Sequence, residues 1–271
     1  LVAMLALTTE MSKRLMPTVV LAVALAAPAA LGTHDFSAGA GKLGVTLIQS
    51  NVAQDEKFAA ERMPDAIAWL SKTVLSARGA LVVAPETAIP LLPDQLEDFA
   101  PGWWETLRTH FAAGAQSALV GLPLGDFDRG YTNSVAGLNA VSLKVGVQGG
   151  HQDGKAHAPF YRYDKQHLVP FGEFIPTGFR WFTELMNIPL GDFMRGPLNA
   201  PSFGVGEQRV APNICYEDLY GEELAVRFVD VSTAPTIMAN LSNIGWFGDT
   251  VALPQHLNIS RMRTLELQRP M

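Results

Sequence analysis

Residues 208–218 read QRVAPNICYED, an apolar, strand-like run that ends at Cys215, and a helix-like run follows over residues 219–229. A strand, a chemically distinctive residue at its carboxyl end and then a helix form the basic unit of α/β folds. Cys215 is the one cysteine of the chain, so it has no partner for a disulfide within the chain. It is therefore either an inert core residue or a residue kept for its reactivity.

The rest of the chain continues the alternation of strands and helices. Short apolar runs predict strands over residues 43–49, 80–84, 118–122, 131–140, 142–148 and 236–241. Helical spacing of apolar residues predicts helices over residues 56–77, 103–113 and 253–268. A proline-rich, irregular stretch occupies residues 160–201. This order predicts an α/β protein with apolar sheets covered by helices.

Composition excludes several classes of function. The 271 residues are 48% hydrophobic, which is enough for a large core, and the net charge is −6 with no basic block. Nucleic-acid binding therefore has little electrostatic support. The six histidines are scattered along the chain, and no paired His or Cys motif indicates a metal site. We expect neither a metal nor another cofactor.

The N-terminal segment differs from the remainder. Residues 15–32 carry no charge and follow Lys13 and Arg14. A start at Met11 would make this segment a signal peptide. We favour a transmembrane helix over residues 15–32, with residues 1–14 as the remnant of a preceding span and a short cytoplasmic turn, and residues 33–42 as a linker. Both alternatives place the domain at residues 43–271 outside the cytoplasm.

The ends of three predicted strands carry conspicuous residues, which are Glu86, Cys215 and residues 240–248, and Lys165 lies at the start of the irregular stretch. Three of these groups could act together on an acyl compound. Cys215 would be the nucleophile and needs a base and a positive charge nearby. Glu86, after the strand at 80–84, could be the base, and Lys165 could stabilise an oxyanion. Each residue alone also has a plain structural explanation, since Glu86 could cap a turn and Lys165 could be a solvated surface charge.

The combination of motifs is much more specific. The chain contains PETA at residues 85–88, RYDKQHLVPFGEFIP at 162–176, ICYE at 214–217 and SNIGWFG at 242–248, followed by Gln255-His256 and RMRTLE at 261–266. Their order and spacing resemble the nitrilase, or carbon–nitrogen hydrolase, superfamily, and within it the apolipoprotein N-acyltransferase family. The resemblance covers about residues 43–271, and it implies a nitrilase-like α-β-β-α sandwich preceded by the apolar helix.

The resemblance also implies a reaction and a location. This family moves a fatty acyl chain from a membrane phospholipid to the α-amino group of a diacylglyceryl-cysteine on a bacterial apolipoprotein. Glu86, Lys165 and Cys215 match its catalytic triad, with a thioacyl intermediate on Cys215. Glu173, Tyr216 and Glu217 match supporting residues. The expected location is the bacterial inner membrane, with the catalytic domain on the periplasmic side.

Aromatic residues near these motifs are candidates for binding the acyl chain. Phe58 stands where family members often have Trp, and we also expect Phe171, Trp246 and Phe247 to contact substrate. The proline-rich stretch could form a lid that enters the membrane interface, or its apolar residues could lie in the core under a long loop. These residues are Phe171, Phe174, Phe179, Trp181, Phe182, Leu185, Met186, Ile188 and Phe193.

Two departures from the family pattern lead to further expectations. The family has several spans before the domain, and further strands and a final span after the point where this chain stops, so we expect a C-terminally incomplete sandwich that is poorly active alone. Two other functions remain open: a secreted or membrane-tethered amidase with the same triad and water as acceptor, and a non-catalytic, membrane-anchored binding domain.

Overall fold

The computed structural model describes residues 11–32, 38–39, 41–52, 56–143, 160–175 and 192–271. The chain divides into a short unit, Leu1–Gly41, and a large unit, Lys42–Met271. The short unit contains the helix α2 (Met11–Leu31), so the helix expected near residues 15–32 forms. Within the described ranges, however, no helix is long and apolar enough to cross a membrane, and the predicted span is not confirmed.

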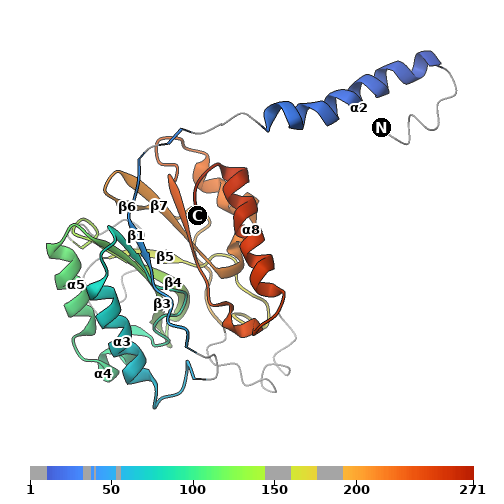
Figure 1. The fold of residues 1–271 in the computed structure, drawn as a ribbon. Coiled ribbons are helices and arrows are strands. Elements are labelled where there is room, and N and C mark those ends of the chain that lie inside the picture. The colour runs from blue at the N-terminus through green and yellow to red at the C-terminus, as the bar shows by residue number, and fades with distance from the viewer. Residues whose placement is uncertain (1–10, 33–37, 40, 53–55, 144–159, 176–191) are drawn as a thin grey trace. The chain divides into compact units, whose positions relative to one another are not determined.

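A sheet with the strand order β1-β2-β3-β4-β5 forms the centre of the large unit (Figure 1). The first three strands run parallel, and the last two are antiparallel to their neighbours. The strands are β1 (Val45–Leu47), β2 (Leu81–Val83), β3 (Ser117–Asp126), β4 (Gly130–Leu138) and β5 (Tyr161–Asp164).

A second, smaller sheet has the order β6-β7-β8. Its strands are β6 (Phe203–Val205), β7 (Gln208–Ile214) and β8 (Ile237–Leu241). β6 and β7 are antiparallel, whereas β7 and β8 run parallel. The strands that the sequence predicts before and after Cys215 are therefore neighbours, and their carboxyl ends meet at one edge.

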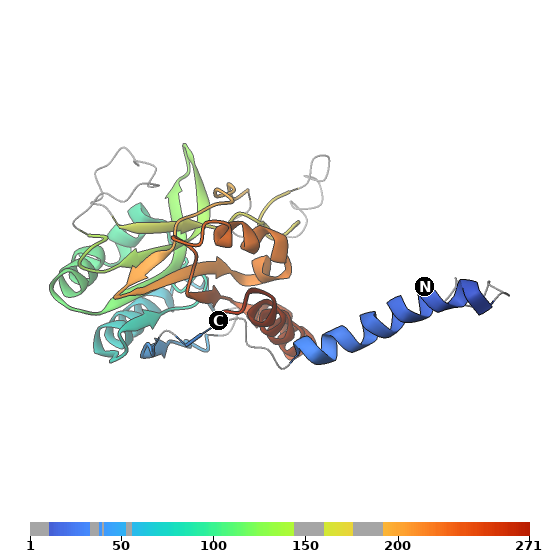
Figure 2. The same cartoon turned by 90° about the horizontal axis from the view of Figure 1, so that it is seen from above.

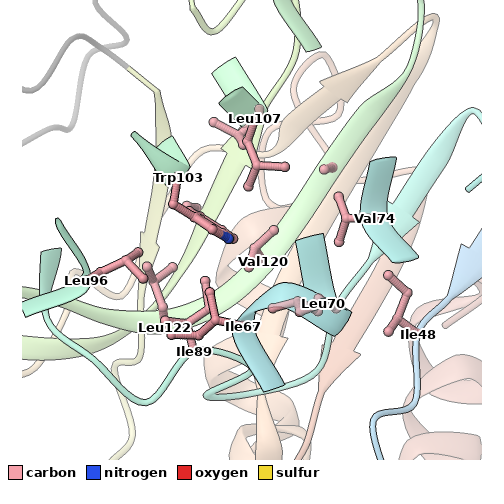
Figure 3. Close-up of a cluster of buried hydrophobic side chains, with 14 of the residues drawn as sticks. Ile48, Ile67, Leu70, Val74, Ile89, Leu96, Trp103, Leu107, Val120 and Leu122 are labelled. Atoms are coloured by element: carbon pink, nitrogen blue, oxygen red, sulfur yellow. The ribbon is translucent and has the colours of Figure 1, made fainter. Parts of the chain in front are cut away.

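Alternation of side chains along the strands divides the core into two layers. Val82 and Val120 pack in a cluster with residues of the helices α3 (Met63–Ser76), α4 (Pro93–Phe99) and α5 (Trp103–Ala113). Figure 3 shows part of this cluster, with Val120 near Leu107 and Trp103 of α5. The strand residues directly before these two valines, Leu81 and Leu119, belong to a different cluster, which includes Val210 of the second sheet. Residues two apart on a strand share a face, so this pattern fixes a helix layer followed by two sheets.

The fourth layer follows the second sheet. It consists of the 3-10 helix η1 (Cys215–Leu219), α7 (Gly221–Ala225), the 3-10 helix η2 (Val226–Phe228) and, after the 3-10 helix η3 (Ile244–Phe247), the helix α8 (Ala252–Leu267). Both views place α8 alongside this sheet, away from α3 and α5 (Figures 1 and 2). The predicted α-β-β-α sandwich is confirmed.

Several predicted elements are wrong in detail. The helix expected over residues 219–229 is divided into the end of η1, α7 and η2, and its first break lies at Tyr220, whose φ of −99° and ψ of 75° are not helical. The helix expected over residues 56–77 begins at Met63, where proline follows in the first turn. The strand expected over residues 142–148 is a turn at 141–143, and its remainder lies outside the described residues. β5, β6 and α4 were not predicted.

Gly121 lies where the backbone of β3 packs closely against the backbone at Pro85 and Glu86. A Cβ atom added to Gly121 would overlap the carbonyl oxygen of Pro85 and lie 2.8 Å from the Cα atom of Glu86. The backbone that carries Glu86 can therefore lie against β3 only because residue 121 has no side chain.

Replacing this glycine should disturb both packing and the position of Glu86. We expect Gly121→Ala to lower the free energy of unfolding by about 1–3 kcal/mol, because the added methyl group overpacks this contact. Gly204→Ala is a matched control, since a Cβ atom there meets nothing within 4 Å. Urea unfolding measures both variants, and equal stability of the two would contradict the packing argument.

Candidate active site

The three residues predicted to form the triad follow three different strands. Glu86 comes after β2, Lys165 directly follows β5, and Cys215 directly follows β7. Lys165 is completely buried, Glu86 is 7% exposed and Cys215 is half-buried. Cys215 interacts electrostatically with both Glu86 and Lys165, so the fold brings together groups that are distant in the sequence.

A buried ammonium group lies between two carboxylates. The Nζ atom of Lys165 is 3.5 Å from Oε1 of Glu86 and 2.9 Å from Oε1 of Glu173. The Nδ2 atom of Asn133, in β4, donates to the same two oxygens at 2.8 and 2.6 Å. Asn133 was missed by the sequence analysis. Its signal is a polar run, Thr132 to Ser134, directly before the apolar residues 135–138, because buried polar side chains in a strand need hydrogen-bond partners.

Backbone donors hold the remaining oxygens of these carboxylates. The N–H of Asn243 donates to Oε2 of Glu86 at 2.8 Å. The N–H of Val169 donates to Oε2 of Glu173 at 2.8 Å. Both side chains are thus bound at each oxygen, which fixes their orientation around Lys165. A second lysine, Lys57, donates to the carbonyl oxygen of Glu86 at 3.3 Å.

Cys215 has an unusual backbone. Its φ of 53° lies in the left-handed region, which is disfavoured for residues other than glycine. The Nδ2 atom of Asn240, in β8, donates to the Cys215 carbonyl oxygen at 2.7 Å and to Oδ1 of Asn213 at 2.6 Å. A sharp turn between β7 and η1 therefore presents the thiol at the strand ends, and a side chain from the neighbouring strand holds that turn.

The surroundings keep the thiol neutral and the ammonium charged. Burial, and then the negative charge of Glu86, raise the pKa of Cys215 to about 12, although Lys165 acts in the opposite direction. Burial lowers the pKa of Lys165, but the charges of Glu86 and Glu173 outweigh it and hold this pKa above its ordinary value. Near neutral pH the thiol thus needs a base before it can attack, and Lys165 is a permanent cation.

Glu217 connects the strand of the lysine to the strand of the cysteine. Its Oε1 atom accepts from the N–H groups of Gln166 at 2.7 Å and His167 at 3.2 Å. Its Oε2 atom accepts from the Tyr163 hydroxyl and from the N–H of Ile214, both at 2.7 Å. Burial raises the pKa of Glu217 against the effect of these bonds. The side chain is a structural clamp next to both Lys165 and Cys215.

The aromatic candidates are less closely tied to this site. The Tyr216 ring lies 5.9 Å from Nζ of Lys165. Phe58 is half-buried, whereas Phe171 is 37% exposed and Phe247 is 57% exposed. Trp246 belongs to η3. The predicted lid residues Phe179, Trp181, Phe182, Leu185, Met186 and Ile188 lie outside the described residues.

Residues 44–271 match the carbon-nitrogen hydrolase family. The chain belongs to that family. Its fold is similar to that of a CN-hydrolase superfamily protein from Xanthomonas campestris that carries an arsenic adduct in its active site. The TM-score is 0.51 at 16% identity, over 83% of this chain and 72% of the other. At this identity the likeness concerns the fold of the carbon–nitrogen hydrolases alone.

Relatives of higher identity carry a narrower name. The apolipoprotein N-acyltransferase of Verminephrobacter eiseniae is 54% identical over 230 residues, which are 84% of this chain and 40% of that protein. The corresponding protein of Ralstonia nicotianae is 45% identical over 248 residues, which are 91% of this chain and 44% of that protein. The resemblance to this branch of the carbon–nitrogen hydrolases is confirmed, and the chain spans less than half the length of these relatives.

The pKa of Cys215 predicts a distinctive alkylation profile. Only the thiolate reacts, so the rate with iodoacetamide should rise about tenfold per pH unit from about pH 7 to 10 without levelling off. Glu86→Gln removes a charge that raises this pKa, and should speed alkylation several-fold at about pH 8. The exposed Glu105→Gln is the control, with circular dichroism at each pH. A plateau below about pH 9 would contradict the assigned environment.

The clamp at Glu217 predicts a large difference between two substitutions. Glu217→Gln places an amide group against backbone donors and should cost about 1–3 kcal/mol for each buried donor left unpaired. Tyr163→Phe removes one of the four donors, leaves the carboxylate bound by the other three, and should cost about 1 kcal/mol. Urea unfolding compares them, and a Gln variant as stable as the Phe variant would exclude the clamp.

Proposed function

We propose that the protein transfers a fatty acyl chain from a membrane phospholipid to the N-terminal α-amino group of a diacylglyceryl apolipoprotein, through a thioester on Cys215. The observation that carries the chemistry is the buried Lys165 ammonium, which lies 3.5 Å from Glu86 and whose charge acts to lower the pKa of the Cys215 thiol. The names of the relatives at 54% and 45% identity support the choice of donor and acceptor.

In the first half-reaction, Sγ of Cys215 attacks the ester carbonyl carbon of the phospholipid. Glu86 takes the thiol proton as the carbon–sulfur bond forms, because the neutral thiol is a poor nucleophile. Lys165 stabilises the negative charge on the carbonyl oxygen. The carbon–oxygen ester bond then breaks, Glu86 returns the proton to the leaving alcohol of the lysophospholipid, and a thioester remains.

The second half-reaction uses the same groups in the reverse order. The neutral α-amine attacks the thioester carbonyl, and Glu86 accepts the proton that the nitrogen loses. Lys165 again stabilises the oxyanion. Breaking of the carbon–sulfur bond releases the thiol, which recovers its proton from Glu86, and leaves the acyl chain in an amide. Two transfers through one covalent intermediate predict ping-pong kinetics.

The lipid nature of both substrates supports a location at a membrane. We assign the catalytic domain to residues 43–271 and place it on the extracytoplasmic face of the bacterial inner membrane, with Lys13 and Arg14 on the cytoplasmic side. Phe171 and Phe247 are exposed large apolar side chains within this domain. We assign them, with Phe58 and Trp246, to contacts with acyl chains.

Intact-mass analysis tests the covalent step. Phospholipid without acceptor should add the mass of one acyl chain to Cys215, and hydroxylamine should release it as expected for a thioester. A diacylated lipopeptide with a free α-amine should then remove the adduct. Cys215→Ser should lower the rate at least about 10³-fold, because a hydroxyl is a weaker nucleophile without its own base arrangement.

Two outcomes would replace the proposal. Turnover of small amides without an adduct from phospholipid would identify an amidase that uses water as acceptor. Binding of lipid that is equal in the wild-type and Cys215→Ser proteins, with no acyl adduct in either, would identify a binding domain. Ser260→Ala is the matched control, because it changes a single side chain in the helix α8, outside the triad.

A further inference from the structure

A chain of polar side chains leads from the nucleophile to the helix α8. Asn240 donates from Nδ2 to the Cys215 carbonyl oxygen at 2.7 Å. The hydroxyl of Ser242 donates to Oδ1 of the same Asn240 side chain. The Oγ atom of Ser242 also lies 2.8 Å from Nε2 of His256, in α8. None of these three side chains has a part in the reaction steps above.

The direction of these hydrogen bonds follows from the Cys215 carbonyl. A carbonyl oxygen only accepts, so Asn240 must turn its NH₂ group to Cys215 and its oxygen to Ser242. The single hydroxyl hydrogen of Ser242 is then used on Asn240. His256 must therefore donate from Nε2–H to the oxygen of Ser242. A side chain without a donor at this position would leave Ser242 free to turn away from Asn240.

The second ring nitrogen of His256 faces η1, the helix that begins at Cys215. Its Nδ1 atom is 3.5 Å from Oδ1 of Asp218, a completely buried residue of η1 three positions after Cys215. Ser260, one turn further along α8, donates to Oδ2 of Asp218 at 2.5 Å. The hydrogen-bonded path from Cys215 through Asn240 and Ser242 to His256 thus ends beside Asp218 of η1, the helix that begins at Cys215.

The same segment also holds the base. Asn243 directly follows Ser242, and its N–H binds Glu86 at 2.8 Å. We infer that His256 and Ser242 are positioning residues of this active site, which hold the Cys215 turn and the Glu86 carboxylate in register through Asn240 and Asn243. The inference deepens the proposed acyl transfer and rests on it for the reaction.

The backbone of Cys215 is the reason why this active site needs positioning residues. A non-glycine residue persists in the left-handed region only when its surroundings hold it there. The carbonyl hydrogen bond from Asn240 is such a restraint, and the bonds of this amide to Asn213 and Ser242 fix its direction. Loss of the His256 donor should therefore displace Sγ from Glu86 without removing any group that touches the substrate.

Three variants separate positioning from folding. His256→Leu removes the donor, whereas His256→Gln keeps an N–H donor at a similar distance from the backbone. Ser260→Ala removes a different hydrogen bond between α8 and Asp218 and serves as the control for docking of α8. Circular dichroism and thermal unfolding establish that each variant is folded.

Two rates are measured for each folded variant: single-turnover formation of the thioester, and alkylation of Cys215 by iodoacetamide. We expect His256→Leu to lower the first at least about tenfold with an unchanged KM for phospholipid, and to change the second by at least about threefold, because the environment of Sγ differs. His256→Gln should stay within about threefold of wild type in both, and Ser260→Ala should match wild type.

Equal rates in the Leu and Gln variants, whether slow or unchanged, would overturn the inference. A loss in Ser260→Ala as large as that in His256→Leu would also overturn it, since general docking of α8 would then explain both. The alkylation reaction requires no acyl donor. If wild-type protein forms no thioester, the acyl-transfer proposal fails, and the alkylation rates still decide whether His256 positions Cys215.

Discussion

The rest of the site depends on one interaction, the buried ion pairing of Lys165 with Glu86 and Glu173 at 3.5 and 2.9 Å. A completely buried ammonium group is tolerated only when counter-charges and hydrogen bonds replace its water. Meeting that condition requires the carboxyl ends of β2 and β5 to lie at the same edge of the sheet, although β3 and β4 separate these strands, and it requires the Glu173 turn to fold back. Asn133 and the backbone donors then complete the binding of the carboxylates, so the constraint extends through both halves of the first sheet.

The same arrangement sets the protonation of the nucleophile. Two carboxylates around one ammonium leave a net negative charge beside Cys215, and burial adds to its effect on the thiol, whose pKa rises to about 12. The site therefore differs from a thiolate stabilised by a neighbouring cation. Proton transfer to Glu86 has to accompany attack, and Lys165, charged throughout, is unsuited to act as a base.

The sequence predicts those parts that depend on local pattern. Apolar runs locate β2, β7 and β8, and the resemblance to the carbon–nitrogen hydrolases predicts Glu86, Lys165 and Cys215 as the triad. β5 was missed because Arg162 and Asp164 make it look polar, although they pair with each other at 2.8 Å. The predicted helix at residues 219–229 breaks at Tyr220, whose backbone leaves the helical region between η1 and α7. Asn133 matters because it donates to Glu86 and Glu173, which are distant in the sequence, and the periodicity of one strand cannot predict such contacts.

Polar contacts, more than apolar packing, determine how the last layer meets the active site. Within the described structure α8 has no buried residue, yet His256 and Ser260 both reach Asp218. Apolar packing permits small sliding movements of a helix, whereas hydrogen bonds to a fully buried carboxylate and to a directed hydroxyl specify one position. The hydrogen bond between His256 and Ser242 supplies such a restraint to the Cys215 turn, whereas the bond of Ser260 to Asp218 fixes the helix α8. The hydrogen bonds of α8 therefore lie next to the turn that carries Cys215, where a displacement of Sγ would slow its attack.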